Sequence, residues 1–197
     1  MKKSFLLLLL ALLPVLASGY DAEIDGIYYD LNQGTKEAEV TSKGSNSYSG
    51  NVVIPSSVTY KGNEYSVTSI DGAFYECTGL TSVTIPNSII NIGRFAFSGC
   101  PSLKSITIPS SVSNIGEGAF YGCTGLTEVN FNATNCTTMG DNTFPVFYGC
   151  TSLTTLTIGN NVQNIPDCAF YGCSGLKSVT IPNSVTSIGK SAFQACI

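Results

Sequence analysis

Cysteine is the residue type in this chain with the widest chemical reach, and it recurs at a nearly fixed spacing. Six of the eight cysteines follow one another at intervals of 23, 23, 27, 23 and 23 residues: Cys77, Cys100, Cys123, Cys150, Cys173 and Cys196. A disulfide framework has irregular spacing, whereas a constant period is typical of a repeat array. Three interpretations of this cysteine ladder stay open, and we favour the first: buried reduced thiols that pack together, disulfides between adjacent units, or a metal-binding stack.

Most residue types that build catalytic sites are missing from the sequence. The chain has no histidine, which excludes Ser-His-Asp and Cys-His pairs and histidine-bound metals. It also has no C-x-x-C motif and no phosphate-binding glycine loop. Asp21, Glu23 and Asp25 alternate, which is more typical of a solvated strand face than of a calcium site. We therefore expect a non-enzymatic protein without a cofactor or metal.

The first 19 residues have the features of a signal peptide. Lys2 and Lys3 precede an apolar run from Phe5 to Leu13, and small residues follow at 17–19. We predict cleavage after Gly19. The mature chain contains no apolar run of the ~20 residues that a membrane span needs, so we expect no transmembrane span. With a formal net charge of −4 and no basic stripe, the chain is not expected to bind nucleic acid.

Apolar residues form fixed columns when the sequence is aligned on the cysteines. Each unit opens with leucine and continues as L-x-x-L-x-L, the strand signature of leucine-rich repeats. The opening leucines are Leu80, Leu103, Leu126, Leu153 and Leu176. The end of this motif alternates with period two, which predicts a strand with one buried and one solvated face. Units close with Ala-Phe-x-x-Cys, which is too short for an α-helix and is expected to form a 3₁₀ or single helical turn.

These columns predict a leucine-rich repeat solenoid, a mainly β, right-handed coil of about 23-residue repeats over residues 66–197. Residues 20–65 contain short β-rich segments, which we interpret as an N-terminal β cap. The unit that ends at Cys150 is four residues longer than its neighbours, and alignment places Cys136 in one of its apolar columns. Because the chain stops just after Cys196, we expect self-association through an uncapped last repeat.

Two surfaces are candidates for binding. Strand alternation places one set of small polar residues outward, at Ser82, Thr84, Ser105, Thr107, Glu128, Asn130, Thr155, Thr157, Ser178 and Thr180. A second set follows the phenylalanine of the closing turn, at Tyr75, Tyr121, Tyr148 and Tyr171. The polar face either binds a polypeptide or glycan or only keeps the strands solvated. The tyrosine stripe either receives sugars or partner side chains or only covers the edge of the core.

The phrase TSVTIPNSIINIGRFAFSGC at residues 81–100 returns at 104–123 and 177–196 with few changes. In this phrase the chain resembles the BspA-like leucine-rich repeat proteins, which anaerobic bacteria and some protozoan parasites export. The resemblance covers residues 66–197. It implies a secreted or cell-surface bacterial protein that mediates adhesion to host or microbial surface proteins or glycans. The alternative is a structural repeat module, or a fragment of a longer array, with no ligand of its own.

Overall fold

A computed structural model describes residues 19–196. The described part of the chain begins with an antiparallel meander of β1 (Ala22–Ile24), β2 (Ile27–Asn32) and β3 (Glu37–Thr41). Asp25 and Gly26 join β1 to β2 with φ angles of 50° and 78°, the left-handed conformations of a type I′ hairpin turn. β5 (Ser57–Tyr60) and β6 (Asn63–Ile70) form a second hairpin, and β3 pairs in parallel with β6. The predicted signal peptide lies outside the described residues, except for Gly19.

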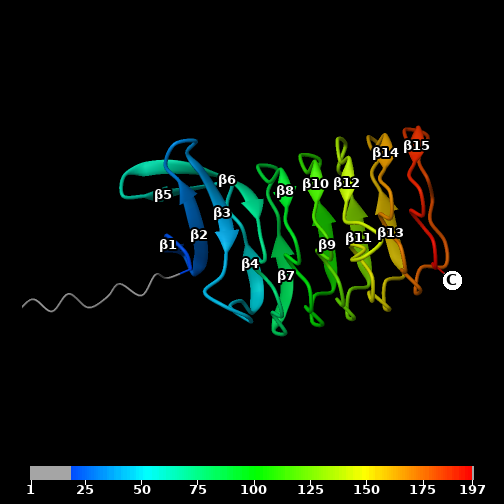
Figure 1. Ribbon diagram of the computed structural model, residues 1–197, viewed down its shortest axis with the longest axis horizontal. Coiled ribbons are helices and arrows are strands. Elements are labelled where there is room, and N and C mark those ends of the chain that lie inside the picture. Colours follow the sequence, from blue (N-terminus) through cyan, green and yellow to red (C-terminus); the bar gives the residue numbers. More distant parts are fainter. Residues whose placement is uncertain (1–18, 197) are drawn as a thin grey trace, which may run out of the picture.

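The rest of the chain winds into a coil with two rows of strands (Figure 1). The first row holds the longer strands: β4 (Gly50–Val53), β7 (Leu80–Thr84), β9 (Ser105–Ile108), β11 (Glu128–Phe131) and β13 (Thr155–Ile158). The second row holds two-residue strands: β8 (Asn91–Ile92), β10 (Asn114–Ile115), β12 (Thr138–Met139), β14 (Asn164–Ile165) and β15 (Ser187–Ile188). All pairings among these strands are parallel, as expected for successive turns of a solenoid. The predicted leucine-rich repeat solenoid is therefore confirmed.

β4 shows that the coil pattern starts before residue 66. It lies within the segment that the sequence assigns to the cap, yet it pairs in parallel with β7, with Val52 opposite Val83. The letters NVVIPSSV at residues 51–58 repeat the phrase SVTIPNSI at 82–89. The ring of Tyr48 packs between Tyr28 and Phe74, so the aromatic core runs without interruption from the meander into the coils.

The core consists of the columns that the sequence predicted. Its centre is a stack of phenylalanine rings, one from each coil, with adjacent centroids 4.8 to 5.6 Å apart: Phe74, Phe97, Phe120, Phe147, Phe170 and Phe193. The opening leucines and the isoleucines of the short strands are buried around this stack, except Ile188 in the last coil. Burial of such columns stabilises each coil only when a neighbour covers it, so the coils are stable as an array.

The closing turns differ from the expectation. Residues 19–196 form no helix, and the Ala-Phe-x-x-Cys segments form isolated turns instead. In the third coil, Ala119, Tyr121 and Cys123 donate their backbone N–H groups three residues back, as in a 3₁₀ helix. The intervening residues Gly118, Phe120 and Gly122 donate to Phe144, Val146 and Tyr148 of the next coil. Because every second N–H bonds between coils, consecutive 3₁₀ hydrogen bonds do not form.

The junction between the fourth and fifth coils, which end at Cys150 and Cys173, lacks most of the backbone hydrogen bonds that join other coils at their short strands and closing turns. In other units, a glycine after the short strand donates its N–H to the preceding coil, as Gly116 does to Ile92 at 2.7 Å. Pro166 occupies that position in the fifth coil and has no N–H to donate. Pro145 of the fourth coil also has no N–H to donate. In the third coil the equivalent residue is Gly118, and its N–H donates to the carbonyl of Phe144 in the following coil at 2.8 Å. Accordingly, β12 and β14 do not pair, while β11 and β13 still join the two coils.

Candidate binding faces

The predicted polar face lies on the row of longer strands. Glu128 of β11 is opposite Ser105 of β9 and Thr155 of β13, and the next outward residues pair in the same way, namely Thr107, Asn130 and Thr157. The structure thus brings these six side chains into one parallel sheet. Ser105, Thr107, Thr155 and Thr157 are exposed, while Glu128 and Asn130 are half-buried. Asn130 Nδ2 donates a hydrogen bond to Glu128 Oε1 at 3.0 Å. The carboxylate of Glu128, the one charged group of this face, therefore already has a hydrogen-bond partner within the protein.

The remaining members of the face flank this sheet. Ser82 and Thr84 lie on β7, which pairs with β4 and lies beside β9. Ser178 and Thr180 are exposed but belong to a segment outside the strands. A groove of about 390 Å³ lies between that segment and β13, and its walls include Thr155, Thr157, Ser178 and Thr180.

Sequence reasoning missed the part of this face on β4. Asn51 Oδ1 accepts a hydrogen bond from Ser82 Oγ at 2.6 Å, and Val53 is 58 % exposed beside it. The repeated phrase at residues 51–58 was the signal that would have found them. The sheet face, defined as the outward residues of β4, β7, β9, β11 and β13 together with Ser178 and Thr180, is therefore longer than expected.

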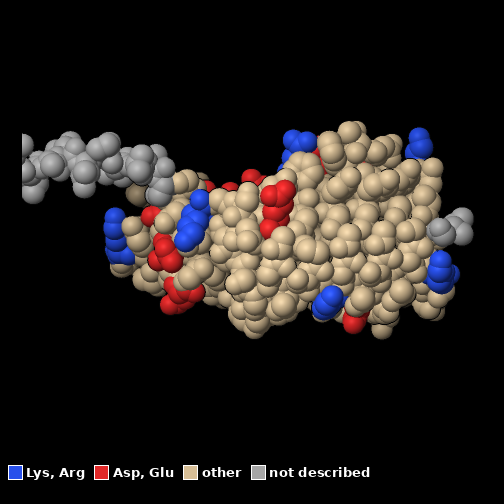
Figure 2. Space-filling model, turned by 90° about the horizontal axis from the view of Figure 1, so that it is seen from below, with Lys and Arg blue, Asp and Glu red and all other residues tan. Residues whose placement is uncertain are grey.

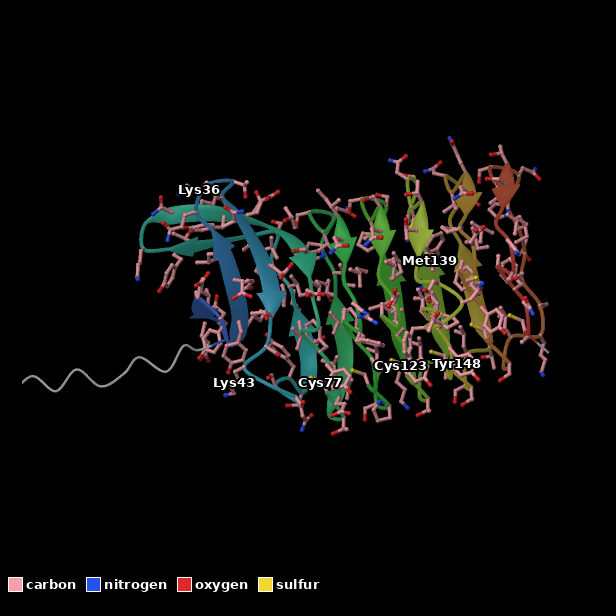
Figure 3. All side chains as sticks on the ribbon, viewed as in Figure 1. Lys36, Lys43, Cys77, Cys123, Met139 and Tyr148 are labelled. Carbon is pink, nitrogen blue, oxygen red and sulfur yellow. The ribbon has the colours of Figure 1, made fainter. Side chains whose placement is uncertain are left out.

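The four predicted tyrosines do not form one stripe. Tyr121 and Tyr148 stack with ring centroids 5.7 Å apart, and Tyr148 and Tyr171 stack at 6.5 Å. Tyr75 is separated from them because Ser98, a buried serine, occupies the same position in the second coil. Figure 3 places Tyr148, like Cys123, toward the lower end of the coils, away from Met139 on the short-strand row.

A loop that sequence reasoning did not assign to any site lies beside the three stacked tyrosines. Three of the four extra residues of the fourth unit fall after β12, in the loop 141–145, which forms a cavity of about 340 Å³ with the rings. The cavity is lined by Tyr121, Asn142, Thr143, Phe144, Pro145, Tyr148 and Tyr171. The longer spacing before Cys150 was the available signal, but spacing alone gives neither the shape nor the direction of a loop.

Several contacts hold this loop in place. Asp141 Oδ1 accepts hydrogen bonds from the backbone N–H groups of Thr143 at 2.7 Å and Phe144 at 2.9 Å. These hydrogen bonds, from Phe144 first and then Thr143, lower the pKa of Asp141. Phe144 packs edge-on against Phe95 at 5.4 Å, and the guanidinium of Arg94 lies over both rings. The Cys168 thiol donates to Asn142 Oδ1 at 2.6 Å, which links the loop to the fifth coil.

All eight cysteines are free thiols, and only Cys196 is partly exposed. Within the ladder, each thiol from the second coil onward donates to the carbonyl of the phenylalanine one coil earlier, for example Cys123 to Phe97 at 3.0 Å. Cys77 instead accepts from the backbone N–H of Tyr48 at 3.4 Å. A hydrogen bond with Cys123, followed by burial, raises the pKa of Cys100. Cys136 is 1 % exposed, in the apolar column where the alignment placed it, and burial raises its pKa to about 11.

Acidic side chains gather at the N-terminal end, as Figure 2 shows for one side of the molecule. There a cavity of about 560 Å³ is lined by Asp21, Asp30, Glu37 and Glu39 among others. Burial, and then the charge of Asp21, raises the pKa of Asp30. Within residues 19–196, no group of three or more Cys, Asp or Glu side chains is arranged to hold a metal ion.

Residues 45–146 and 145–197 match the BspA type leucine rich repeat region, in six copies. The chain belongs to the BspA-type leucine-rich repeat family. The family match begins at residue 45, just before β4, in agreement with the parallel pairing of β4 and β7. A search of curated proteins found no match.

Three solved structures of leucine-rich repeat proteins are similar to this chain. The protein from Bacteroides ovatus ATCC 8483 is 32 % identical, with a TM-score of 0.58 over 90 % of this chain and 51 % of that protein. The leucine rich cell surface protein of Faecalibacterium prausnitzii A2-165 is 30 % identical, with a TM-score of 0.55 over 89 % of this chain and 52 % of that protein. The T. pallidum protein TpLRR is 25 % identical, with a TM-score of 0.61 over 89 % of each chain. The present chain thus spans about half the length of the first two proteins.

In this BspA-type array, two surfaces offer binding chemistry. The sheet face offers small hydroxyl and amide groups at regular intervals, and the tyrosine groove, defined as the cavity between residues 141–145 and Tyr121, Tyr148 and Tyr171, offers aromatic surface and phenolic hydroxyls. Within residues 19–196 no helix is long and apolar enough to cross a bilayer.

Proposed function

We propose that the protein is an exported, non-enzymatic repeat module that adheres to surface-exposed polypeptides of a host or of other microbes. The observation that carries this proposal is the sheet face, where outward serine, threonine and asparagine side chains stand in register across β9, β11 and β13. Parallel strands lie about 4.8 Å apart, so the face repeats the same donors and acceptors at that interval. An extended polypeptide laid along the array would meet many weak hydrogen bonds of the same kind.

The low charge of the sheet face favours a polypeptide over a nucleic acid or a strongly charged polymer. Glu128 is the only ionisable side chain among its ten predicted residues, and it is already hydrogen-bonded to Asn130. Serine and threonine lose little side-chain entropy when they are held in an interface, so many such contacts can add up. The alternative, a spacer whose hydroxyl groups serve only solubility, predicts the same fold but no ligand.

Placement outside the cell rests on two observations. The predicted signal peptide ends at Gly19, and Tyr20 is expected to be the first residue of the mature protein. The similar protein of F. prausnitzii is described as a cell surface protein. Expression with the complete N-terminus in a bacterial host, followed by mass spectrometry of the exported protein, tests this part. A mature chain that begins at Tyr20 supports export, whereas an intact Met1 on cell-associated protein contradicts it.

The adhesion experiment uses the mature protein on immobilised extracellular-matrix proteins, each tested before and after enzymatic removal of its glycans. We expect the parent to bind at least one deglycosylated matrix protein. The Thr107→Lys/Thr157→Lys double variant should weaken that binding at least about tenfold, because two lysines add bulk and charge at the centre of the sheet face. Thr151→Lys, a change at an exposed turn outside the face, is the matched control. No binding to any deglycosylated protein, or equal binding by the double variant, would reject the proposal.

A further inference from the structure

The tyrosine groove exists because the fourth unit has three more residues between its short strand and its closing turn than the third unit has. Residues 142–145 of the loop line one side of it, and Tyr121, Tyr148 and Tyr171 line the other. Its volume of about 340 Å³ lies at the small end of the ~300–1,000 Å³ range of small-molecule sites. The groove is built from the closing turns and shares no lining residue with the groove beside β13 on the sheet face.

Hydrogen-bonding groups of the groove are left without partners. Within residues 19–196, the hydroxyl groups of Tyr121, Tyr148 and Tyr171 make no hydrogen bond to other protein groups. Asn142 Oδ1 accepts from the Cys168 thiol, which fixes the amide and leaves its Nδ2 donors without a partner among these residues. The groove therefore presents donors and acceptors that a ligand rich in hydroxyl groups would satisfy.

The same groove carries apolar surface and no charge. Tyr121 and Tyr148 are 38 % and 44 % exposed, and the half-buried Phe144 and the buried Pro145 complete the apolar part of the lining. None of the seven lining residues is an aspartate, glutamate, lysine or arginine. Arg94, whose guanidinium lies over Phe95 and over Phe144 of the lining, is already 2.8 Å from Glu117. An anionic ligand would therefore find no positive partner among the lining residues.

The groove is held in shape before any ligand arrives. Asp141 fixes the backbone of the loop, Phe144 anchors it against Phe95, and Asn142 ties it to Cys168 of the next coil. On the opposite side, the ring of Tyr148 lies across Gly172, where an added Cβ would come within 2.7 Å of the ring. A preorganised site loses less entropy when it binds, so a few contacts can give measurable affinity.

We propose that the tyrosine groove binds a neutral saccharide. A sugar ring combines apolar C–H faces with a rim of hydroxyl groups, and the groove combines aromatic and proline surface with phenol and amide groups. The absence of charge among the lining residues selects an uncharged sugar over a uronate, sialylated or sulfated one. This second site goes beyond the proposed adhesion through the sheet face, because it has a different ligand and uses different residues.

The test uses the mature protein on an array of neutral hexose and N-acetylhexosamine oligosaccharides, together with sialylated and sulfated counterparts. The best neutral binder is then titrated by calorimetry and by intrinsic fluorescence, which reports tyrosine directly because the chain has ten tyrosines and no tryptophan. We expect Tyr148→Ala to weaken binding at least about tenfold, as for an aromatic anchor. Tyr75→Ala is the matched control, since Tyr75 is 40 % exposed at the same position of its coil but lies outside the groove.

Conservative variants keep the test decisive if the alanine variant unfolds. Tyr121→Phe and Tyr148→Phe retain the stacked rings and remove only the hydroxyl groups, so they should fold normally and bind several-fold more weakly. The Thr107→Lys/Thr157→Lys variant should bind the saccharide as the parent does, which separates this site from the sheet face. The proposal fails if no neutral oligosaccharide binds, if charged sugars bind more tightly, if the Tyr148 variants bind like the parent, or if Tyr75→Ala causes an equal loss.

Discussion

Pro145 and Pro166 lie on opposite sides of one junction between coils, and each replaces a residue whose N–H bonds across the junction in other units. The two coils remain joined by β11 and β13 and by side chains, among them Asn164 Nδ2 bonded to the carbonyl of Cys136 at 3.3 Å. The Cys173 thiol is 4.0 Å from the carbonyl of Phe147, whereas the Cys123 thiol is 3.0 Å from that of Phe97. The junction is therefore looser than its neighbours on the side of the closing turns.

We expect amide hydrogen exchange to be fastest at this junction among the closing turns of the inner coils. Phe120 and Gly122 donate their N–H groups to Val146 and Tyr148 of the next coil. Phe147 and Gly149 hold the equivalent positions one coil later, and within residues 19–196 their N–H groups have no backbone partner. Exchange measured by NMR at these four amides should be at least about tenfold faster for the second pair, because local opening there breaks no backbone hydrogen bond.

The matched pairs make this prediction independent of sequence effects, because both begin with phenylalanine and end with glycine in the same turn. Equal protection of Phe147 and Phe120 would mean that the junction is closed in solution. A useful second measurement is the exchange of Thr157 in β13, which lies midway between Thr155 and Gly159, whose N–H groups donate to Thr127 and Phe131 of the preceding coil. It should stay slow, since the pairing of β11 with β13 is intact.

The contrast between this junction and the rest of the array shows what the sequence could predict. The leucine and phenylalanine columns are local, periodic signals, and their burial follows directly from the repeat. The alignment also placed Cys136 in the core, because an apolar column tolerates a small thiol. The role of Pro145 and Pro166 was not predictable in the same way. It depends on which N–H groups cross between coils, and that pattern appears only when two turns are placed side by side.

The two candidate binding surfaces differ in the same way: the sequence predicted most of the sheet face but did not predict the tyrosine groove. Outward positions such as Thr107 and Thr157 follow from strand alternation alone, so the sheet face was predictable apart from its extension onto β4. The tyrosine groove was not, although its tyrosines were identified. The direction of residues 141–145 depends on Phe144 packing against Phe95 and on Asn142 reaching Cys168, two contacts between different coils.

Phe120 should contribute far more to stability than its sequence neighbour Tyr121. The Phe120 ring is fully buried and lies 4.9 Å from Phe97 and 5.0 Å from Phe147. Phe120→Ala should lower the free energy of unfolding by about 3–5 kcal/mol, because the array cannot collapse around the cavity that it leaves. Tyr121→Ala removes a partly exposed ring with one stacking contact and should cost less than about 1.5 kcal/mol. Urea unfolding followed by circular dichroism measures both, and similar losses for the two variants would contradict the central position of the phenylalanine stack.

The cysteine ladder predicts a graded reactivity of its thiols. Cys123 is fully buried, whereas Cys196 is partly exposed. A hydrogen bond from the Cys173 thiol lowers the pKa of Cys196 to about 7. Thiolate is the reactive form, so labelling of Cys196 by iodoacetamide in the folded protein should rise between about pH 6 and 8 and then level off. A free cysteine, with a pKa near 8.5, would continue to gain reactivity above pH 8.

Peptide mapping after brief labelling identifies the reacting residue. We expect Cys196 to carry the label in the folded protein, and Cys100, Cys123 and Cys150 to react only after unfolding in urea. Cys196→Ser is the control and should abolish labelling of the folded chain. Its Cys173 should stay protected, because that thiol remains buried and burial by itself disfavours the thiolate. Labelling of Cys123 as fast as Cys196 would show that the ladder opens to solvent. Eight cysteines that resist labelling even in urea would show that they are joined as disulfides.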